Sequence, residues 1–221
     1  MNMKWFSNLV ILLLGGLYGC VPIRPIYVSP APSPFYHKES GVVGGAIMPL
    51  VEPEKALWVS GEYLRWKNKE ANIDMGVLPH VVLSDDVNSG NVFLYMRRWF
   101  GTAKAENPWG NLHGGLQLAV NNYGVSKDSL EFPVHFELGF SPGIFRKRFN
   151  VAFPLRVGIG TLFTQRSTYM YAGPGIQGSF NLSSRLVFQT QFNFTLGIGA
   201  SDKAFYLPIP ALITLGIHYK F

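Results

Sequence analysis

The stretch from Ile209 to Phe221 decides the fold, and it reads I-P-A-L-I-T-L-G-I-H-Y-K-F. Side chains of a β-strand point alternately to its two faces, so every second residue of this stretch shares a face. One face is apolar throughout and consists of Ile209, Ala211, Ile213, Leu215, Ile217, Tyr219 and Phe221. The other face is small or polar and consists of Pro210, Leu212, Thr214, Gly216, His218 and Lys220. The pattern predicts a strand of a membrane barrel, with its apolar face toward lipid and its polar face toward the lumen.

The aromatic end of this strand resembles the C-terminal insertion signal of bacterial outer-membrane β-barrels, with Phe221 last and Tyr219 two residues before it. The resemblance covers this strand and, more loosely, the seven strands predicted before it. It implies an all-β, antiparallel up-and-down transmembrane β-barrel similar to the OmpA transmembrane domain, OmpX and OmpW. It also implies that the barrel-assembly machinery reads the terminal strand.

Composition favours a membrane protein without membrane helices. Charged residues make up 14% of the 221 residues, whereas soluble domains carry roughly 25%. No stretch reaches the roughly 18 to 20 consecutive apolar residues that a spanning helix needs. The net charge of +6 comes from Lys and Arg residues dispersed over predicted strand ends and turns, which argues against nucleic-acid binding.

The N-terminal sequence predicts export. Lys4 precedes a short apolar run, Leu9 to Leu17, so residues 1–19 are interpreted as a signal peptide. The run ends in L-Y-G-C at Cys20, which resembles the lipobox of bacterial lipoproteins, where the cysteine is acylated after cleavage. We therefore expect a lipid, such as palmitate, on Cys20. The alternative is a plain cleavable signal and an incidental cysteine.

The segment after Cys20 is predicted to be a spacer. Five prolines between Val21 and Phe35 exclude helix and central strand and favour an extended conformation. We predict that residues 20–40 form a lipidated, Pro-rich tether on the periplasmic side and that residues 41–221 form the barrel. Gly41 to Met48 is apolar and Gly-rich, and it is interpreted as a plug, as the beginning of a strand or as an extra strand.

Eight strands of membrane-spanning length follow. They are Leu57 to Lys67, Asn91 to Gly101, Leu112 to Asn122, Leu130 to Phe140, Val151 to Phe163, Met170 to Leu182, Leu186 to Gly199 and Ile209 to Phe221. Each is near or above the roughly 9 to 11 residues that a tilted strand needs to cross a bilayer. A ten-stranded alternative adds Gly41 to Met48 and Gly76 to Leu83.

The connections predict an orientation. With the tether in the periplasm, the connections Thr102 to Asn111, Ser141 to Asn150 and Ser183-Ser184 are periplasmic, and so is the C-terminus. The longest connection, Asn68 to Gly90, then lies outside, as is usual for such barrels. It is predicted to be a polar surface loop, and its acidic and histidine residues are candidates for contact with a surface partner: Asp74, His80, Asp85 and Asp86.

Several ionisable side chains are predicted to point into the lumen. An eight-stranded barrel is filled by its own side chains, and buried charges need paired, hydrogen-bonded partners. Strand pairing is expected to bring Glu137 and His135 near Arg156, and Gln117 near His135. The predicted lumen network comprises Gln117, Glu131, His135, Glu137 and Arg156, with His113, His218 and Lys220 also facing inward. We interpret it as structural; an acid/base or ligand site of Glu131, His135 and Glu137 is the alternative.

The expected role is structural or interactive at the cell surface. A narrow channel for small or hydrophobic solutes is the alternative. An enzyme that modifies lipid A is less favoured, because no nucleophile motif appears and His135 points away from lipid. We expect no metal, no cofactor and no nucleic acid, a monomer in the outer membrane, and contacts with membrane lipid and lipopolysaccharide.

Overall fold

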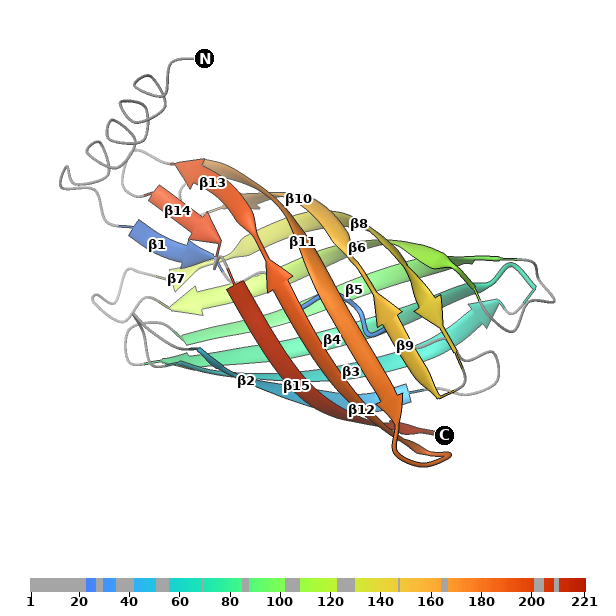
Figure 1. The fold of residues 1–221 in the computed structure, drawn as a ribbon. Coiled ribbons are helices and arrows are strands. Elements are labelled where there is room, and N and C mark those ends of the chain that lie inside the picture. Colours follow the sequence, from blue (N-terminus) through green and yellow to red (C-terminus); the bar gives the residue numbers. More distant parts are fainter. Residues whose placement is uncertain are drawn as a thin grey trace, which may run out of the picture.

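The computed structural model describes residues 23–26, 30–34, 42–50, 56–68, 70–84, 88–101, 108–122, 130–146, 148–163, 167–200, 205–208 and 211–221. Most of these residues lie in β-strands (Figure 1). The strands are β1 Ile23–Ile26, β2 Val42–Leu50, β3 Ala56–Asn68, β4 Ile73–Ser84, β5 Asn88–Phe100, β6 Gly110–Asn122, β7 Leu130–Glu131, β8 Pro133–Phe145, β9 Phe149–Ala152, β10 Leu155–Leu162, β11 Ser167–Asn181, β12 Leu186–Phe194, β13 Leu196–Ala200, β14 Phe205–Pro208 and β15 Ala211–Lys220.

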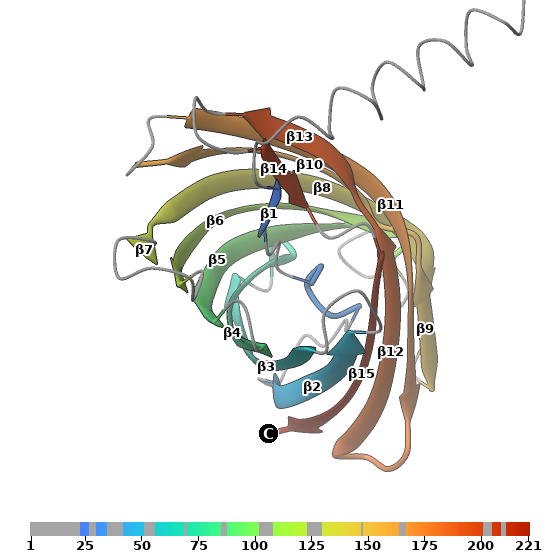
Figure 2. The ribbon, with the colours of Figure 1, turned by 90° about the vertical axis from the view of Figure 1, so that its left-hand side faces the viewer.

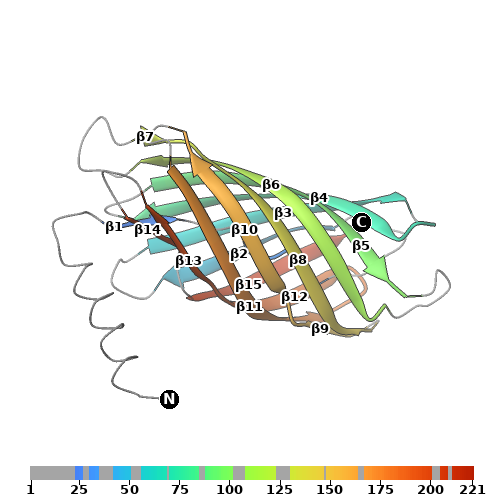
Figure 3. The same ribbon diagram turned by 90° about the horizontal axis from the view of Figure 1, so that it is seen from above.

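One antiparallel sheet closes on itself. Successive strands from β2 onward pair with their neighbours, and β15 then returns to pair with β2 from Lys220↔Val42 to Leu215↔Ile47. The strands share a common tilt (Figure 3), and the view along the axis shows the ring that they form (Figure 2). The all-β, antiparallel up-and-down fold predicted from the sequence is confirmed, and its sheet is closed.

The wall has ten passes in the described residues, so the count of eight is wrong. Several short strands join to make a single pass. β7 and β8 form one pass, because both pair with β6, and β9 and β10 form another, because both pair with β8 and β11. Likewise β12 continues into β13 and β14 into β15. The two additional passes are β2 and β4, the segments of the ten-stranded alternative.

The predicted surface loop between Asn68 and Gly90 is mostly strand β4. Pro79 lacks an N–H for the ladder, and this makes the segment read as a loop in the sequence. In the fold Pro79 pairs with Val92, and the neighbouring His80 is buried in the lumen. Asp74 is buried as well, so neither side chain is available to a surface partner. Asp85 and Asp86 lie outside the described residues.

Alternation sets the two faces of the wall. In β5 every second residue is buried, and the exposed positions between them include Val92, Leu94 and Met96. The terminal strand β15 follows its prediction, since Ile213, Leu215, Ile217, Tyr219 and Phe221 are exposed while Thr214, Gly216, His218 and Lys220 are buried. The outer surface is thus a continuous apolar face and the inner surface is largely polar, as in a transmembrane barrel.

The barrel has two mouths. The C-terminal mouth carries Phe221 and the turns at residues 70–72 and 182–185, and the opposite mouth carries Asn88 and Phe205, where β5 and β14 begin. The tight turn into β4 places Asn72 at a φ of 54°, a left-handed conformation that Asn tolerates. The predicted periplasmic turns lie at the C-terminal mouth, and the one expected at Ser141 to Asn150 is shorter because β8 and β9 extend into it.

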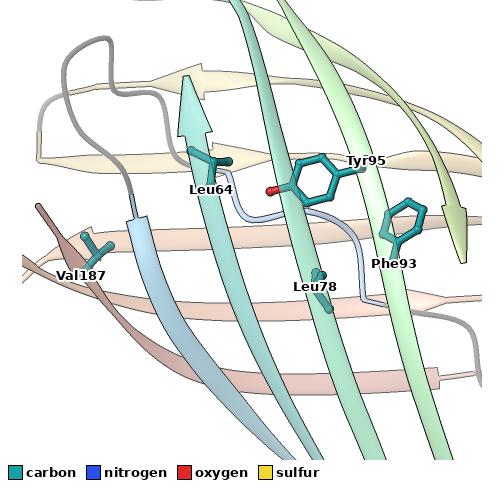
Figure 4. Packing of buried hydrophobic residues seen from close by; sticks show 5 residues of the cluster. All are labelled: Leu64, Leu78, Phe93, Tyr95 and Val187. Carbon is teal, nitrogen blue, oxygen red and sulfur yellow. The ribbon is translucent and has the colours of Figure 1, made fainter. Parts of the chain in front are cut away.

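Part of the interior is apolar. Leu64, Leu78, Phe93 and Tyr95 are buried side by side on β3, β4 and β5 and form one cluster with Val187 (Figure 4). Trp99, Phe145 and Ala152 form a second cluster nearer the C-terminal mouth. These two clusters occupy part of a lumen that ten passes make wider than eight would.

Candidate functional site in the barrel lumen

The lumen is lined by buried polar side chains from almost every pass of the wall. Those discussed below are Glu62, Asp74, Asn91, Arg97, His113, Gln117, Glu131, His135, Glu137, Arg156, Gln177, Gln189 and His218, none more than 5% exposed. All five residues of the predicted lumen network are among them. Two charged clusters stand out, one centred on Glu137 and one on Glu62 and Asp74.

Glu137 is the centre of the first cluster. Arg156 on β10 donates from Nε to Glu137 Oε1 over 2.9 Å and from Nη2 to Oε2. The Tyr171 hydroxyl on β11 also donates to Oε2, and His113 Nε2 on β6 lies 3.1 Å from Oε1. The predicted approach of Glu137 to Arg156 is seen, and it arises because Glu137 pairs with Gly158 and Gly139 with Arg156 in the same ladder.

Glycines on the wall make room for this cluster. A Cβ atom on Gly139 would lie 2.1 Å from His113 Cε1, and one on Gly158 would lie 2.3 Å from the Tyr171 ring. Real Cβ atoms do not approach other atoms this closely. The small residues therefore let His113 and Tyr171 lie flat against the wall and reach Glu137.

The other predicted residues lie toward the opposite mouth. His135 Nδ1 lies 2.8 Å from the Tyr169 hydroxyl. Gln117 pairs with His135 in the ladder, as expected, but its amide donates to Asn91 Oδ1 over 2.8 Å. Glu131 pairs with Asn121 and is 1% exposed. Glu131, on β7, and His135 and Glu137, on β8, all face the lumen from one pass of the wall. The Tyr171 ring links two of them, because it lies edge-on to His135 with ring centres 5.5 Å apart and its hydroxyl donates to Glu137.

The second cluster was missed by the sequence reading. Arg97 on β5 donates to Asp74 from Nε to Oδ1 and from Nη2 to Oδ2, both over 2.9 Å, and its guanidinium stacks 4.5 Å from the Trp99 ring centre. Trp99 Nε1 also donates to Asp74 Oδ2 over 2.7 Å. Alternation in β5 would have pointed Arg97 and Trp99 inward, but their partner Asp74 was assigned to a loop.

The segment Pro30–Pro34, here called the strap, lies inside the barrel. All five of its residues are buried. Arg97 Nη1 donates to the Ser33 carbonyl, and Gln177 Nε2 donates to the carbonyls of Ala31 and Pro32 over 3.2 and 3.1 Å. This part of residues 20–40, which were predicted to be a tether, is held inside the barrel by side chains of the wall.

Ser33 fixes the strap to several strands. Its backbone N–H donates to Glu62 Oε1 over 3.1 Å, and its Oγ contacts Glu62 Oε2 and lies 2.6 Å from Gln189 Oε1. Tyr95 donates its hydroxyl to Glu62 Oε1 over 2.6 Å. His218 Nε2 is 3.3 Å from Glu62 Oε2 and 3.4 Å from Ser33 Oγ.

Serine, histidine and a carboxylate are the residue types of a hydrolase triad, but this geometry differs from one. A triad uses one ring nitrogen toward serine and the other toward the carboxylate, whereas His218 Nε2 is the atom near both. The cavity beside Ser33 has a free volume of about 10 Å³, which holds roughly one water molecule. The arrangement is suited to holding a segment of chain.

The described residues contain no group of three or more His, Cys, Asp or Glu side chains placed to hold a metal ion. Within the same residues, no helix is long and apolar enough to cross a membrane. Cys20, with its predicted acylation, lies outside the described residues. Tyr219 and Phe221 end the terminal strand on its outer face.

A closed antiparallel sheet with an apolar exterior and a largely polar interior defines the class: a transmembrane β-barrel. Neither a protein-family model nor a curated protein sequence matches the chain. Among solved structures, the chain is similar to the outer membrane protease OmpT from Escherichia coli, with 11% identity, a TM-score of 0.43, and coverage of 82% of this chain and 93% of that one. It is also similar to an anion-selective porin from Comamonas acidovorans, with 14% identity, a TM-score of 0.34, and coverage of 75% and 49%. The attachment invasion locus protein Ail of Yersinia pestis shows 14% identity, a TM-score of 0.19, and coverage of 82% and 97%.

Proposed function

We propose that this protein is a barrel of the bacterial outer membrane whose lumen is closed at rest, with a structural or surface-interaction role. The exposed apolar side chains of its outer face are suited to lipid and lipopolysaccharide. In this proposal Cys20 is acylated, the barrel-assembly machinery recognises Tyr219 and Phe221, and the barrel is monomeric.

The strap is the observation that carries this proposal. Ser33 is 2% exposed and contacts Glu62, Gln189 and His218 from three different passes, while Arg97 holds its carbonyl from a fourth. Charged and amide groups committed in this way to a segment of the chain are not available to line an aqueous path. The apolar cluster around Phe93 fills a further part of the cross-section.

Ion conductance in planar bilayers tests the proposal. The purified wild-type protein should give no stable conductance. Ser33→Trp places a large side chain where about 10 Å³ is free, so it should displace the strap and produce conductance. Ser184→Trp adds the same side chain to an exposed turn at the C-terminal mouth and should stay silent. Steady conductance by the wild-type protein would overturn the closed state.

A narrow channel is the second candidate, favoured by the polar lining of the lumen along β5, β6 and β8. Under this alternative the wild-type protein conducts without any change to the strap. A folded but silent Ser33→Trp variant would instead show that the wall's own side chains are sufficient to close the lumen. Heat-modifiable migration in gels verifies that each variant is folded.

We propose no catalytic role. The buried Ser33, His218 and Glu62 have no room for a substrate beside them, and they hold the strap. Release of fatty acid from lipopolysaccharide by the purified protein would contradict this part of the proposal.

A further inference from the structure

The first strand lies at the mouth opposite the C-terminus. β1 pairs in parallel with β14, from Ile23↔Phe205 to Ile26↔Pro208, and β14 begins at the opposite mouth. Figure 1 shows β1 beside β13 and β14 at one end of the barrel and the C-terminus at the other. β1 therefore runs inward from the opposite mouth.

The edge of β14 explains why β1 lies there. β14 and β15 form one pass, and the pairing of this pass with β2 stops at Leu215↔Ile47. The residues of β14 therefore lie beyond the part of the pass that β2 covers. An unpaired strand edge exposes N–H and C=O groups that attract other strands. β1 covers this edge with a parallel ladder of four residue pairs.

The strap continues the same path toward the C-terminal mouth. Ser33 contacts His218, two residues from Lys220, and Gln189, four residues from the turn residue Arg185. β2 then begins at Val42, which pairs with Lys220 at that mouth. Three segments that follow one another in the sequence thus lie one after another along the barrel axis. β1 lies at the opposite mouth, the strap lies in the lumen, and β2 begins at the C-terminal mouth.

The chain is long enough for this path. An extended proline-rich chain advances about 3.1 Å per residue, and the hydrocarbon core is about 30 Å thick. The residues between Ile26 and Val42 can therefore span it with length to spare. Both β1 and the strap lie within the ring of strands in the axial view (Figure 2).

We propose that the chain threads through its own barrel, so that the segment preceding β1 emerges on the membrane face opposite Phe221. This inference rests on the proposed membrane location. It differs from the expectation that the tether and the C-terminus share the periplasmic side. The predicted acyl group of Cys20 then inserts in the leaflet opposite the C-terminal mouth.

Cysteine labelling from one side of the membrane tests this topology. Three variants each add one cysteine: Arg24→Cys in β1, Asn88→Cys at the opposite mouth and Ser184→Cys at the C-terminal mouth. A membrane-impermeant maleimide is applied to intact cells and then to cells with a permeabilised outer membrane. The parent protein gives the background from Cys20.

If the opposite mouth faces outward, Arg24→Cys and Asn88→Cys should both react in intact cells, whereas Ser184→Cys should react only after permeabilisation. If the C-terminal mouth faces outward, the two results should be exchanged. Reaction of Arg24→Cys together with Ser184→Cys would overturn the threaded topology. If Asn88→Cys and Ser184→Cys react under the same condition, the membrane-spanning arrangement itself fails, which separates the two proposals.

Discussion

Glu137 is a buried carboxylate whose charge is neutralised within the lumen. Arg156 donates to both of its oxygens, and Tyr171 and His113 complete its surroundings. Burial of such ions is costly, and the cost is offset when each charge keeps its partner and its hydrogen bonds. The cluster is therefore expected to matter most when one partner is removed.

Glu137→Gln should destabilise the barrel. The amide keeps the shape of the side chain but leaves Arg156 buried without a counter-charge, which costs roughly 3–5 kcal/mol. The measurement is the urea midpoint of the heat-modifiable form in detergent. Glu70→Gln, in an exposed turn, is the matched control and should leave the midpoint unchanged.

A double variant separates charge from shape. Glu137→Gln combined with Arg156→Met removes both charges and should lose less stability than the two single variants together. A loss of stability in the double variant equal to the sum of the two single losses would show that the two side chains do not act as a pair.

Gly139→Ala should also destabilise the barrel. The added methyl group would meet His113, which is 1% exposed and in contact with Glu137, so it has little freedom to move away. Overpacking of this kind costs about 1–3 kcal/mol. Gly90→Ala is the matched control, because a Cβ there meets nothing within 4 Å. Indistinguishable unfolding midpoints for the two variants would refute the packing argument.

At the scale of the strand, the closing seam joins β15 to β2 and β2 to β3. Phe221 stacks on Tyr63 across this seam, with ring centres 6.1 Å apart and planes 20° apart. Arg185 Nη1 also donates to the Tyr219 hydroxyl over 3.2 Å. The last residues of the chain thus contact both sides of the junction that closes the barrel.

Phe221→Ala should lower the fraction of folded protein in the outer membrane. It removes the stacking partner of Tyr63 and the terminal aromatic residue on which the predicted insertion signal depends. Quantifying heat-modifiable protein in outer-membrane fractions measures this fraction. Phe163→Ala is the control, since Phe163 is 62% exposed against 56% for Phe221. An equal effect of both variants would remove the special role of the terminal residue.

Sequence periodicity predicted the passes whose two faces differ sharply. β8, β12 and β15 alternate apolar and polar residues, so their inward residues followed from the sequence, although β8 runs on to Phe145, past its predicted end at Phe140. β4 was harder to recognise from the sequence, because it contains Pro79 and because its inward residues are both polar and apolar: Asp74, Gly76, Leu78 and His80. The pairing of Asp74 with Arg97 could not be predicted once β4 was interpreted as a loop.

At the scale of the whole molecule, the position of the strap had no sequence signal. Prolines indicated an extended segment, but an extended segment outside the barrel and one inside it have the same composition. Only the partners distinguish the two, and these come from distant strands: Glu62, Arg97, Gln177, Gln189 and His218.

Hydrogen exchange should show that the strap belongs to the folded unit. Pro30, Pro32 and Pro34 lack amide hydrogens, so only Ala31 and Ser33 report on it. The Ser33 amide is bonded to the buried Glu62 and should exchange as slowly as amides of the wall. The Ala71 amide, bonded to Asn68 in an exposed turn, should exchange fast. Fast exchange at Ser33 would mean that the strap leaves the lumen frequently.

The path of the strap also makes the barrel a mechanical link. In the proposed threaded topology, a pull on β1 from the opposite mouth loads the strap, and the contacts of Ser33 pass that load to Glu62, Gln189 and His218. Val42 is the residue that pairs with Lys220 in the closing seam. Because His218 lies on β15, a strand of that seam, the proposed topology delivers tension from one face of the membrane to the closure of the barrel.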